Sequence, residues 1–157
     1  MDGTTDTSTI EQAVIGAIHA ITPRHVHERA ARWQYTPSDR LSGRAVMAGD
    51  ALRSFDLVWR NVGPSFLWYG NGEAYSGELS IGVSYRGVPP DRLAQMIGDD
   101  GVDLRSALMA LGEPTNTGLS HFEHLGLGEY EIDDSANATV EHRFRVHWAQ
   151  DTDLVQP

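Results

Sequence analysis

A chain of 157 residues, 40% hydrophobic and 22% charged, is long enough to bury the core of one globular domain. Its formal net charge of −10 disfavours general binding to nucleic acid or to anionic lipid. It has no cysteine and its 12 basic residues are all arginine, which excludes disulfides, thiolate chemistry and mechanisms that need a lysine. We expect a single domain over residues 1–157, with flexible tails at 1–8 and 150–157.

The first predicted element is a helix that begins after Ser8 or Thr9, since either residue can cap it. Four apolar residues recur with the spacing of one helical face: Ile10, Val14, Ile18 and Ile21. Pro23 ends this pattern. The arginine-rich stretch 24–53 has no clear periodicity, and we expect a long connection of a kind that is often functional or interfacial.

Two strands are predicted next, over 55–62 and 78–86, because apolar and polar side chains alternate there. The residues expected to share the inward face are Phe55, Leu57 and Trp59 in the first strand and Leu79, Ile81, Val83 and Tyr85 in the second. A connection of about sixteen residues joins the strands and carries the aromatic run 66–69 and the turn signal 70–72. Loops of that length are typically functional or mobile.

A helical region follows from Pro90, a residue that suits the first position of a helix. Apolar stripes lie at 93–97 and 104–111, and the stretch 98–101 with its two glycines interrupts them. We therefore expect two short helices or one broken helix. The acidic run 99–103 is interpreted as a turn that caps the second piece.

The last two predicted strands span 119–133 and 139–149. The first has an irregular phase, and Gly126 and Gly128 mark a bulge. The second has the clearest alternation in the chain, with Val140, His142, Phe144, Val146 and Trp148 on one face and Thr139, Glu141, Arg143, Arg145 and His147 on the other. Such a strand packs a core on one side only.

This order of elements predicts the α+β class. We expect a single mixed or antiparallel sheet of about four strands with helices packed on one face. The predicted order is α, long connection, β, β, broken α, β, β.

No pattern in the sequence indicates a catalytic, cofactor or metal site. His25-x-His27 and His121-x-x-His124 have short spacings, but each pair lacks a third ligand. Residues three apart on a strand also point to opposite faces. The acids of 99–103 lack the spacing of a calcium loop. We therefore expect no enzymatic activity, no cofactor and no metal.

The charged outer face of the last strand is the most unusual surface that the sequence predicts. We expect Glu141, Arg143 and Arg145 to lie at or near a subunit contact. The further candidates for such a contact are Arg53, Arg60, Trp68 and Tyr69. Charge is also uneven along the chain, with a local excess of arginine in 24–53 and of acids elsewhere. Such a distribution suits subunits that meet basic edge to acidic edge, although chance produces it as well.

The layout of the chain resembles that of the tail terminator proteins of long-tailed bacteriophages and phage-like particles. The resemblance rests on the element order and four phrases: the Gly-rich loop before Glu78-Leu79-Ser80-Ile81-Gly82-Val83, the Pro-led helix from Pro90 through Leu111, the strand 119–133 running into an acidic turn, and the ending Phe144-Arg145-Val146-His147-Trp148. It covers roughly residues 9–149.

The resemblance implies a structural virion protein. In that family, six copies form a ring on the head-proximal end of the tail tube. The ring stops growth of the tube protein and joins it to a head–tail connector or neck protein, and genomic DNA crosses the lumen only in transit. The resemblance also implies assembly in the host cytoplasm, no membrane contact, and a place for the candidate residues at a subunit contact or in the lumen.

Two alternatives stay open at this point. The chain could be another neck or connector component of the same virion. It could instead be a small-molecule-binding α+β domain that uses the aromatic loop and nearby histidines.

Overall fold

The computed structural model describes residues 7–22, 33–35, 52–64, 73–86, 88, 90–111, 120–128, 130 and 137–150. Its elements, in chain order, are α1 (Thr7–His19), β1 (Gln34–Tyr35), β2 (Leu52–Pro64), β3 (Glu73–Arg86), α2 (Pro90–Leu111), β4 (Ser120–Leu127) and β5 (Ala138–Gln150). The α+β class and the order of the helices and long strands are therefore as the sequence predicts.

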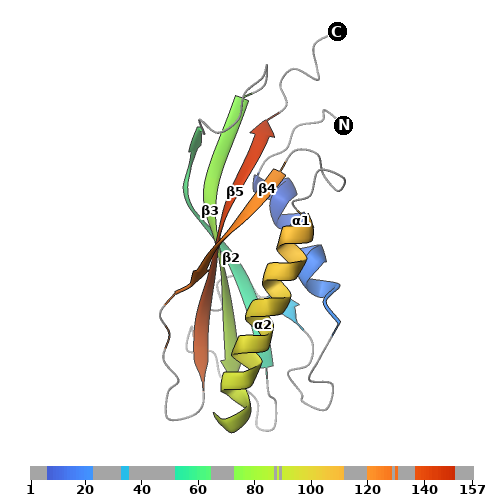
Figure 1. Cartoon of the computed structure of the whole chain (residues 1–157), viewed down its shortest axis with the longest axis vertical. Helices are drawn as coiled ribbons and strands as arrows, with labels where there is room; N and C mark the ends of the chain where they lie inside the picture. Colours follow the sequence, from blue (N-terminus) through green and yellow to red (C-terminus); the bar gives the residue numbers. More distant parts are fainter. Residues whose placement is uncertain are drawn as a thin grey trace.

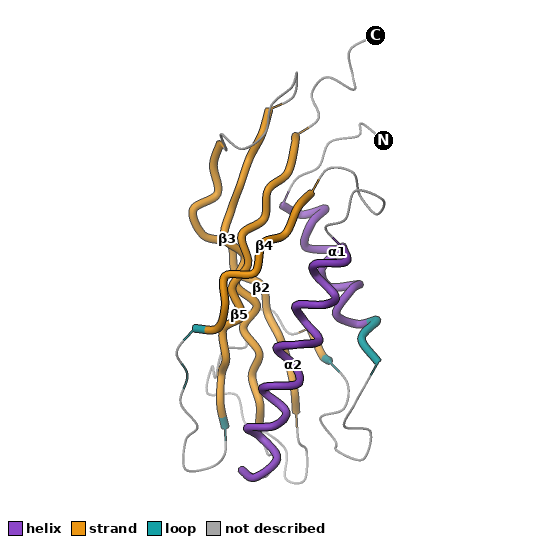
Figure 2. Tube along the Cα trace, in the orientation of Figure 1, coloured by secondary structure: helices purple, strands orange, loops and turns teal. Residues whose placement is uncertain are grey.

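The strands form one sheet in the order β1-β2-β3-β5-β4. The four long strands are antiparallel to their neighbours, and the two-residue β1 pairs parallel with Ser54 and Phe55 of β2. Both helices lie on the same side of this sheet, as Figure 1 and Figure 2 show. The sheet thus has one face that packs against helices, called the helix face below, and one face that does not.

The core lies between the helix face and the two helices. The helices contribute the buried residues Ile10, Val14, Ile18, Leu93, Met96, Ile97, Leu104 and Leu108. The four long strands contribute Phe55, Leu79, Ile81, Val83, Tyr85, Phe122, Ala138, Val140, Phe144, Val146 and Trp148. Each fully buried large apolar side chain contributes about 1.5 to 3 kcal/mol, so this layer fixes where both helices sit.

α2 is one continuous helix of 22 residues, and the prediction of a broken helix is wrong. The stretch 98–101 and the acidic run 99–103 both lie inside it. Each interior glycine costs about 1 kcal/mol relative to alanine, yet tertiary contacts offset that cost here. Asp100 is buried in an ion pair, and Gly101 passes over His142, whose Cε1 atom would lie 3.7 Å from a Cβ at that glycine.

The hairpin of β2 and β3 is longer than the alternation suggests. β3 begins at Glu73 and β2 runs to Pro64, so residues 65–72 alone separate the two strands and the predicted sixteen-residue loop is wrong. The extension includes a bulge between Arg60 and Gly63, where Asn61 takes a positive φ of 55°. Bulges of this kind hide the period of two on which a strand prediction depends.

Both ends of the described chain are more regular than expected. α1 begins at Thr7 and β5 continues to Gln150, which corrects the predicted tails at those residues. β4 ends at Leu127, short of the predicted 133. Its irregularity lies between His124 and Gly126, and Gly126 has a φ of 113°, so the bulge predicted there is confirmed.

Candidate functional site

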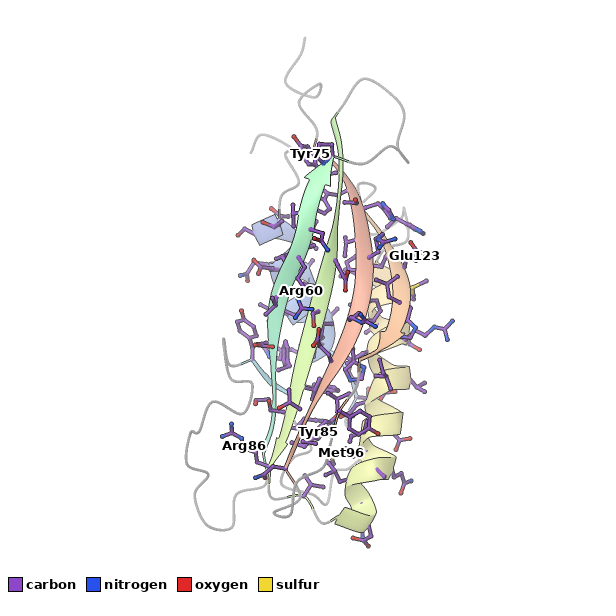
Figure 3. The ribbon with its side chains drawn as sticks, turned by 90° about the vertical axis from the view of Figure 1, so that its left-hand side faces the viewer. Arg60, Tyr75, Tyr85, Arg86, Met96 and Glu123 are labelled. Atoms are coloured by element: carbon purple, nitrogen blue, oxygen red, sulfur yellow. The ribbon has the colours of Figure 1, made fainter. Side chains whose placement is uncertain are left out.

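The face of the sheet that the helices leave uncovered carries a group of charged side chains. We call it the charged face and define it by six residues: Arg60 of β2, Glu78 of β3, Glu123 of β4, and Glu141, Arg143 and Arg145 of β5. In Figure 3 this face is turned toward the viewer, with Arg60 near its middle, Glu123 at one edge and the helices behind. Four of the seven predicted contact residues therefore lie on one surface.

One row of this face crosses all four long strands. Arg60 lies opposite Glu78, Glu78 lies opposite Arg145, and Arg145 lies opposite Glu123. Side chains directly opposite on antiparallel strands share a face and have Cβ atoms about 4.5 to 5.5 Å apart. The row therefore alternates in sign, positive, negative, positive, negative, from one side of the sheet to the other.

Contacts between rows tie the same residues together. Arg60 lies 3.4 Å from Glu141, and Arg143 lies 4.0 Å from Glu78. The buried hydroxyl of Ser80 donates a hydrogen bond of 2.7 Å to Glu141. Exposed ion pairs contribute about 0 to 1 kcal/mol each, so these contacts position the side chains more than they stabilise the fold. The six charges balance to zero, which makes this an ordered polar surface and not a basic patch.

Two histidines flank the row on the same face. His147 of β5 has its Nε2 atom 3.5 Å from Glu123, and its ring stacks on that of His121 with centroids 5.9 Å apart. Burial lowers the pKa of His147, although the neighbouring Glu123 opposes this shift. His147 is therefore mostly neutral at pH 7 and adds little positive charge to the face.

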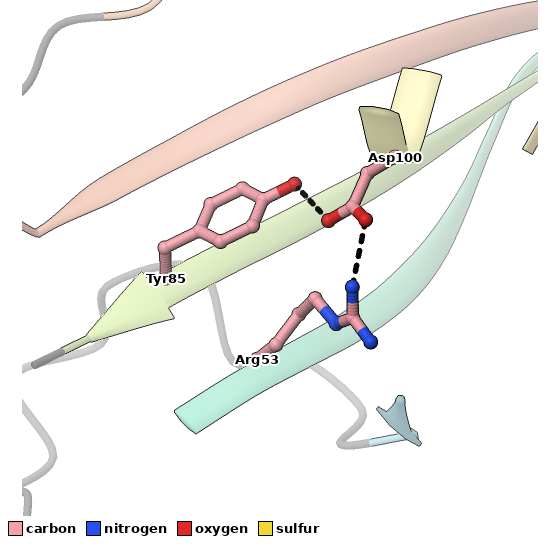
Figure 4. Close-up of polar contacts among 3 residues, drawn as sticks. All are labelled: Arg53, Tyr85 and Asp100. Carbon is pink, nitrogen blue, oxygen red and sulfur yellow. Dashed lines mark hydrogen bonds and ion pairs between the residues drawn. The ribbon is translucent and has the colours of Figure 1, made fainter. Parts of the chain in front are cut away.

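Arg53 does not lie on the charged face, and its prediction as a surface contact residue is wrong. Its side chain is 2% exposed and pairs with Asp100 of α2 at 2.7 Å on the helix face. The hydroxyl of Tyr85 donates a second hydrogen bond of 2.6 Å to the same carboxylate, as Figure 4 shows. The guanidinium also stacks 4.1 Å from the centre of the Trp33 ring. Arg53 thus joins β2 to α2.

The buried carboxylate of Asp100 stays ionised at neutral pH. Burial raises its pKa to about 6, while the Arg53 charge and the Tyr85 hydroxyl hold it below neutrality. The sequence held a signal for this pair, because Arg53 falls in the same phase as the inward-facing Phe55 and Leu57. Its partner gave no signal, since Asp100 sits in an acidic run typical of a turn.

His142 is the second polar group that the helix face buries. It is 1% exposed, and neither ring nitrogen has a hydrogen-bond partner within the described chain. Burial, with a smaller effect of His124, lowers its pKa to about 4, so it is a neutral ring at pH 7. It interrupts the buried apolar residues of β5 between Val140 and Phe144.

The histidines lie apart as the strand period predicts. His121 and His147 are on the charged face, whereas His124 and His142 are on the helix face. Among the described residues, no three His, Asp or Glu side chains are placed to hold a metal ion. Trp68 and Tyr69 lie outside the residues that the structure describes, as do His25 and His27.

Neither α1 nor α2 is long and apolar enough to cross a membrane. Compared with known protein families and with curated protein sequences, the chain matches no family model and no curated relative.

Proposed function

We propose that this protein is a non-catalytic structural component of a phage or phage-like tail, a tail terminator. Several copies, six by analogy with the family that the chain resembles, form a ring at the head-proximal end of the tail tube. The ring stops tube growth and presents the surface to which a neck or connector protein binds.

The observation that carries this proposal is the one-sided covering of a long, regular sheet. All helices of the described chain pack on one face, and the other face presents charged side chains at fixed positions along rows of the sheet. Because every copy in a closed ring has the same orientation, such a subunit can turn its helices outward and its charged face toward the lumen. The layout of helices and strands is also the one that the resemblance implies.

The charge balance of that face suits a channel for DNA. A lumen rich in arginine would bind phosphates through counterion release and retard the genome. The charged face instead carries three arginines and three glutamates, and the whole chain has a formal net charge of −10. With the bulkier helices outside and this face inside, the lumen would be polar and hydrated without attracting DNA strongly.

The first prediction tests ring formation directly. Native mass spectrometry and negative-stain imaging of the full chain should show closed rings, alone or on the ends of tail tubes that lack a terminator. The double variant Arg143→Glu/Arg145→Glu should lose most ring formation, because it places only acidic charge across the middle of the charged face. Its far-UV circular dichroism should match the wild type, since both side chains lie outside the core.

A matched control is Arg92→Glu/Arg105→Glu, which makes the same change in charge at exposed positions on α2. It should assemble as the wild type does. A wild-type chain that stays monomeric at high concentration and ignores tail tubes would overturn the proposed function. Binding to purified connectors but not to tubes would assign the protein to the neck instead.

A further inference from the structure

The two sides of the sheet end in strand edges that no described strand covers. β4 is the last strand on one side and pairs only with β5. On the other side, β1 pairs with Ser54 and Phe55, and no described strand pairs with the outer edge of β2 over 57–64. An exposed edge presents backbone N–H and C=O groups that can pair with another strand.

These two edges, which the described strands leave uncovered, lie at the same level of the sheet. One row of directly opposed residues runs from Leu57 through Ile81 and His142 to Leu127. Another runs from Pro64 through Tyr75 and Trp148 to Ser120. The outer edge of β4 over 120–127 therefore stands level with 57–64 of β2, which is the part that β1 leaves uncovered.

The strand directions also match. β2, β3, β5 and β4 are each antiparallel to the next, so β4 runs opposite to β2. A second copy placed beside the first in the same orientation would bring its β2 antiparallel to β4. Because the two edges are level, the next copy does not need to move along the strand direction. Copies related by rotation alone close into a ring, whereas an added translation would give a filament.

The charged row identifies a second copy as the partner that this edge fits. The row ends in Glu123 at the β4 edge and begins with Arg60 at the β2 edge. Placing the next copy alongside puts its Arg60 opposite Glu123. The alternation of charge then continues across the contact between the two copies, which we call the seam. Both side chains are half-exposed, at 50% and 51%, so each is accessible to a neighbouring copy.

Exposed apolar side chains occur on the same two strands. Leu127 on β4 is 47% exposed and Val62 on β2 is 46% exposed. Leu127 shares a row with Leu57, so Leu57 of the next copy would lie beside it. Burial of these side chains at a seam contributes about 25 cal/mol for each Å² of apolar surface removed from water.

Both edges are interrupted by bulges, between Arg60 and Gly63 on β2 and between His124 and Gly126 on β4. Interrupted edges pair poorly with arbitrary strands, which protects the free chain from aggregation. Pairing at such a seam is confined to short runs and depends on matched side chains for its specificity.

We propose that the ring closes by strand pairing, in which the outer edge of β4 joins residues 57–64 of β2 in the next copy. The sheets of all copies then form one continuous sheet around the lumen. The inference rests on the ring proposed above and names the surface that holds it together.

The second prediction is a covalent test of this seam, which the absence of native cysteine makes possible. In Arg60→Cys/Glu123→Cys, the two new thiols within one copy lie three strand spacings apart, about 14 Å. A disulfide needs Cα atoms about 4.4 to 6.8 Å apart, so it can form only between copies. Mild oxidation should give a ladder of cross-linked species on a non-reducing denaturing gel, ending at the number of copies in the ring. Each single-cysteine variant should stay monomeric on that gel.

Mixing two charge variants tests the same contact without cross-linking. Arg60→Glu alone and Glu123→Arg alone each place like charges at every seam, and each should assemble about tenfold more weakly. An equimolar mixture restores opposite charges at every seam of a ring with an even number of copies. Assembly should then return to within about twofold of the wild type.

The outcomes separate this inference from the proposed function. Rings that form without cross-linking of the double-cysteine variant would overturn the β4–β2 seam while keeping the ring. Charge variants that assemble normally alone would also overturn the seam. Absence of rings from the wild-type chain under all conditions would overturn both proposals.

Discussion

The two faces of the sheet differ more than any other two regions of this molecule, although they share the same backbone. Along β5, Phe144 is fully buried and the next residue, Arg145, is exposed. The helix face holds the helices to the sheet through apolar burial. The charged face carries cross-strand contacts between charged and polar side chains. The apolar core and the row of charged side chains therefore lie on opposite sides of one sheet.

The same contrast appears in the two arginine–carboxylate pairs of β2. Arg53 and Asp100 are 2.7 Å apart and 2% and 1% exposed, whereas Arg60 and Glu141 are 3.4 Å apart and 50% and 26% exposed. A buried charge that loses its partner has no water to replace it. An exposed pair loses little, because solvent already screens it. Removing the arginine of the pair should therefore lower the stability of the fold much more on the helix face than on the charged face.

The largest expected effect comes from breaking the buried pair. Arg53→Met removes the charged partner of Asp100 while keeping most of the apolar side chain, and should lower the free energy of unfolding by about 3 to 5 kcal/mol. The matched variant on the charged face, Arg60→Met, should change it by less than about 1 kcal/mol. Urea denaturation at pH 7 measures both. An equal decrease in the free energy of unfolding for the two variants would contradict this difference between the faces.

The two faces should also differ in how much their buried histidines lower the stability of the fold at acid pH. The pKa of His142 falls from 6.5 to about 4 in the folded chain, so the unfolded chain binds the proton first. Folding stability is therefore lost as the pH falls from about 6.5 toward 4, by about 3 kcal/mol in total. Asp100 acts in the opposite direction, because its folded pKa of about 6 lies above the unfolded value of 3.8 and stability rises as the pH falls through that window.

The two effects are separated by comparing variants. The stability gained by His142→Leu relative to the wild type should grow by about 2 to 3 kcal/mol between pH 7 and pH 4.5, since only the histidine contribution is removed. His147→Leu on the charged face should show a smaller change with pH, because Glu123 opposes the lowering of that pKa. A pH-independent difference for His142→Leu would show that the ring is not buried as a neutral group. Urea titrations across this pH range measure all three chains.

The smallest expected change in stability comes from replacing a glycine by alanine, once on each face of the sheet. A Cβ at Gly77 would lie 2.9 Å from Val62 Cγ2 and 3.0 Å from Trp59 Cε3, so Gly77→Ala should destabilise the fold by about 1 to 3 kcal/mol. Gly63 aligns with Ser76 on the other face and has nothing within 4 Å of a Cβ. Gly63→Ala should be neutral or stabilise by about 0.4 to 1 kcal/mol. Thermal unfolding of both variants measures the difference, and equal midpoints would contradict it.

Regular alternation made the strands and their inward faces predictable. Leu79, Ile81, Val83 and Tyr85 on β3 and the apolar residues of β5 face the helices as the period of two requires. The stripe of Ile10, Val14 and Ile18 on α1 is likewise buried. These features follow from local sequence because a side chain's direction on a strand or helix depends on its position alone.

The predictions failed where a distant partner overrides local preference. The glycines and acids of 98–101 are poor helix formers, yet α2 continues through them because Asp100 reaches Arg53 and Tyr85 across the core. An arginine is seldom buried without a partner, and the partner of Arg53 lies 47 positions away, where local sequence does not reveal it. The extra length of β2 and β3 was missed because a bulge interrupts the alternation.

By itself, the sequence determined that this protein is an α+β domain with a sheet charged on one side, because periodicity is a local property of the chain. The charges of Arg60, Glu78, Arg145 and Glu123 are scattered over four segments and form no motif. Only the tertiary structure decided that they align in one row and that the outer edges of β2 and β4 stand level. Strand order and register depend on pairing between distant segments, which is where the specific surface of this protein arises.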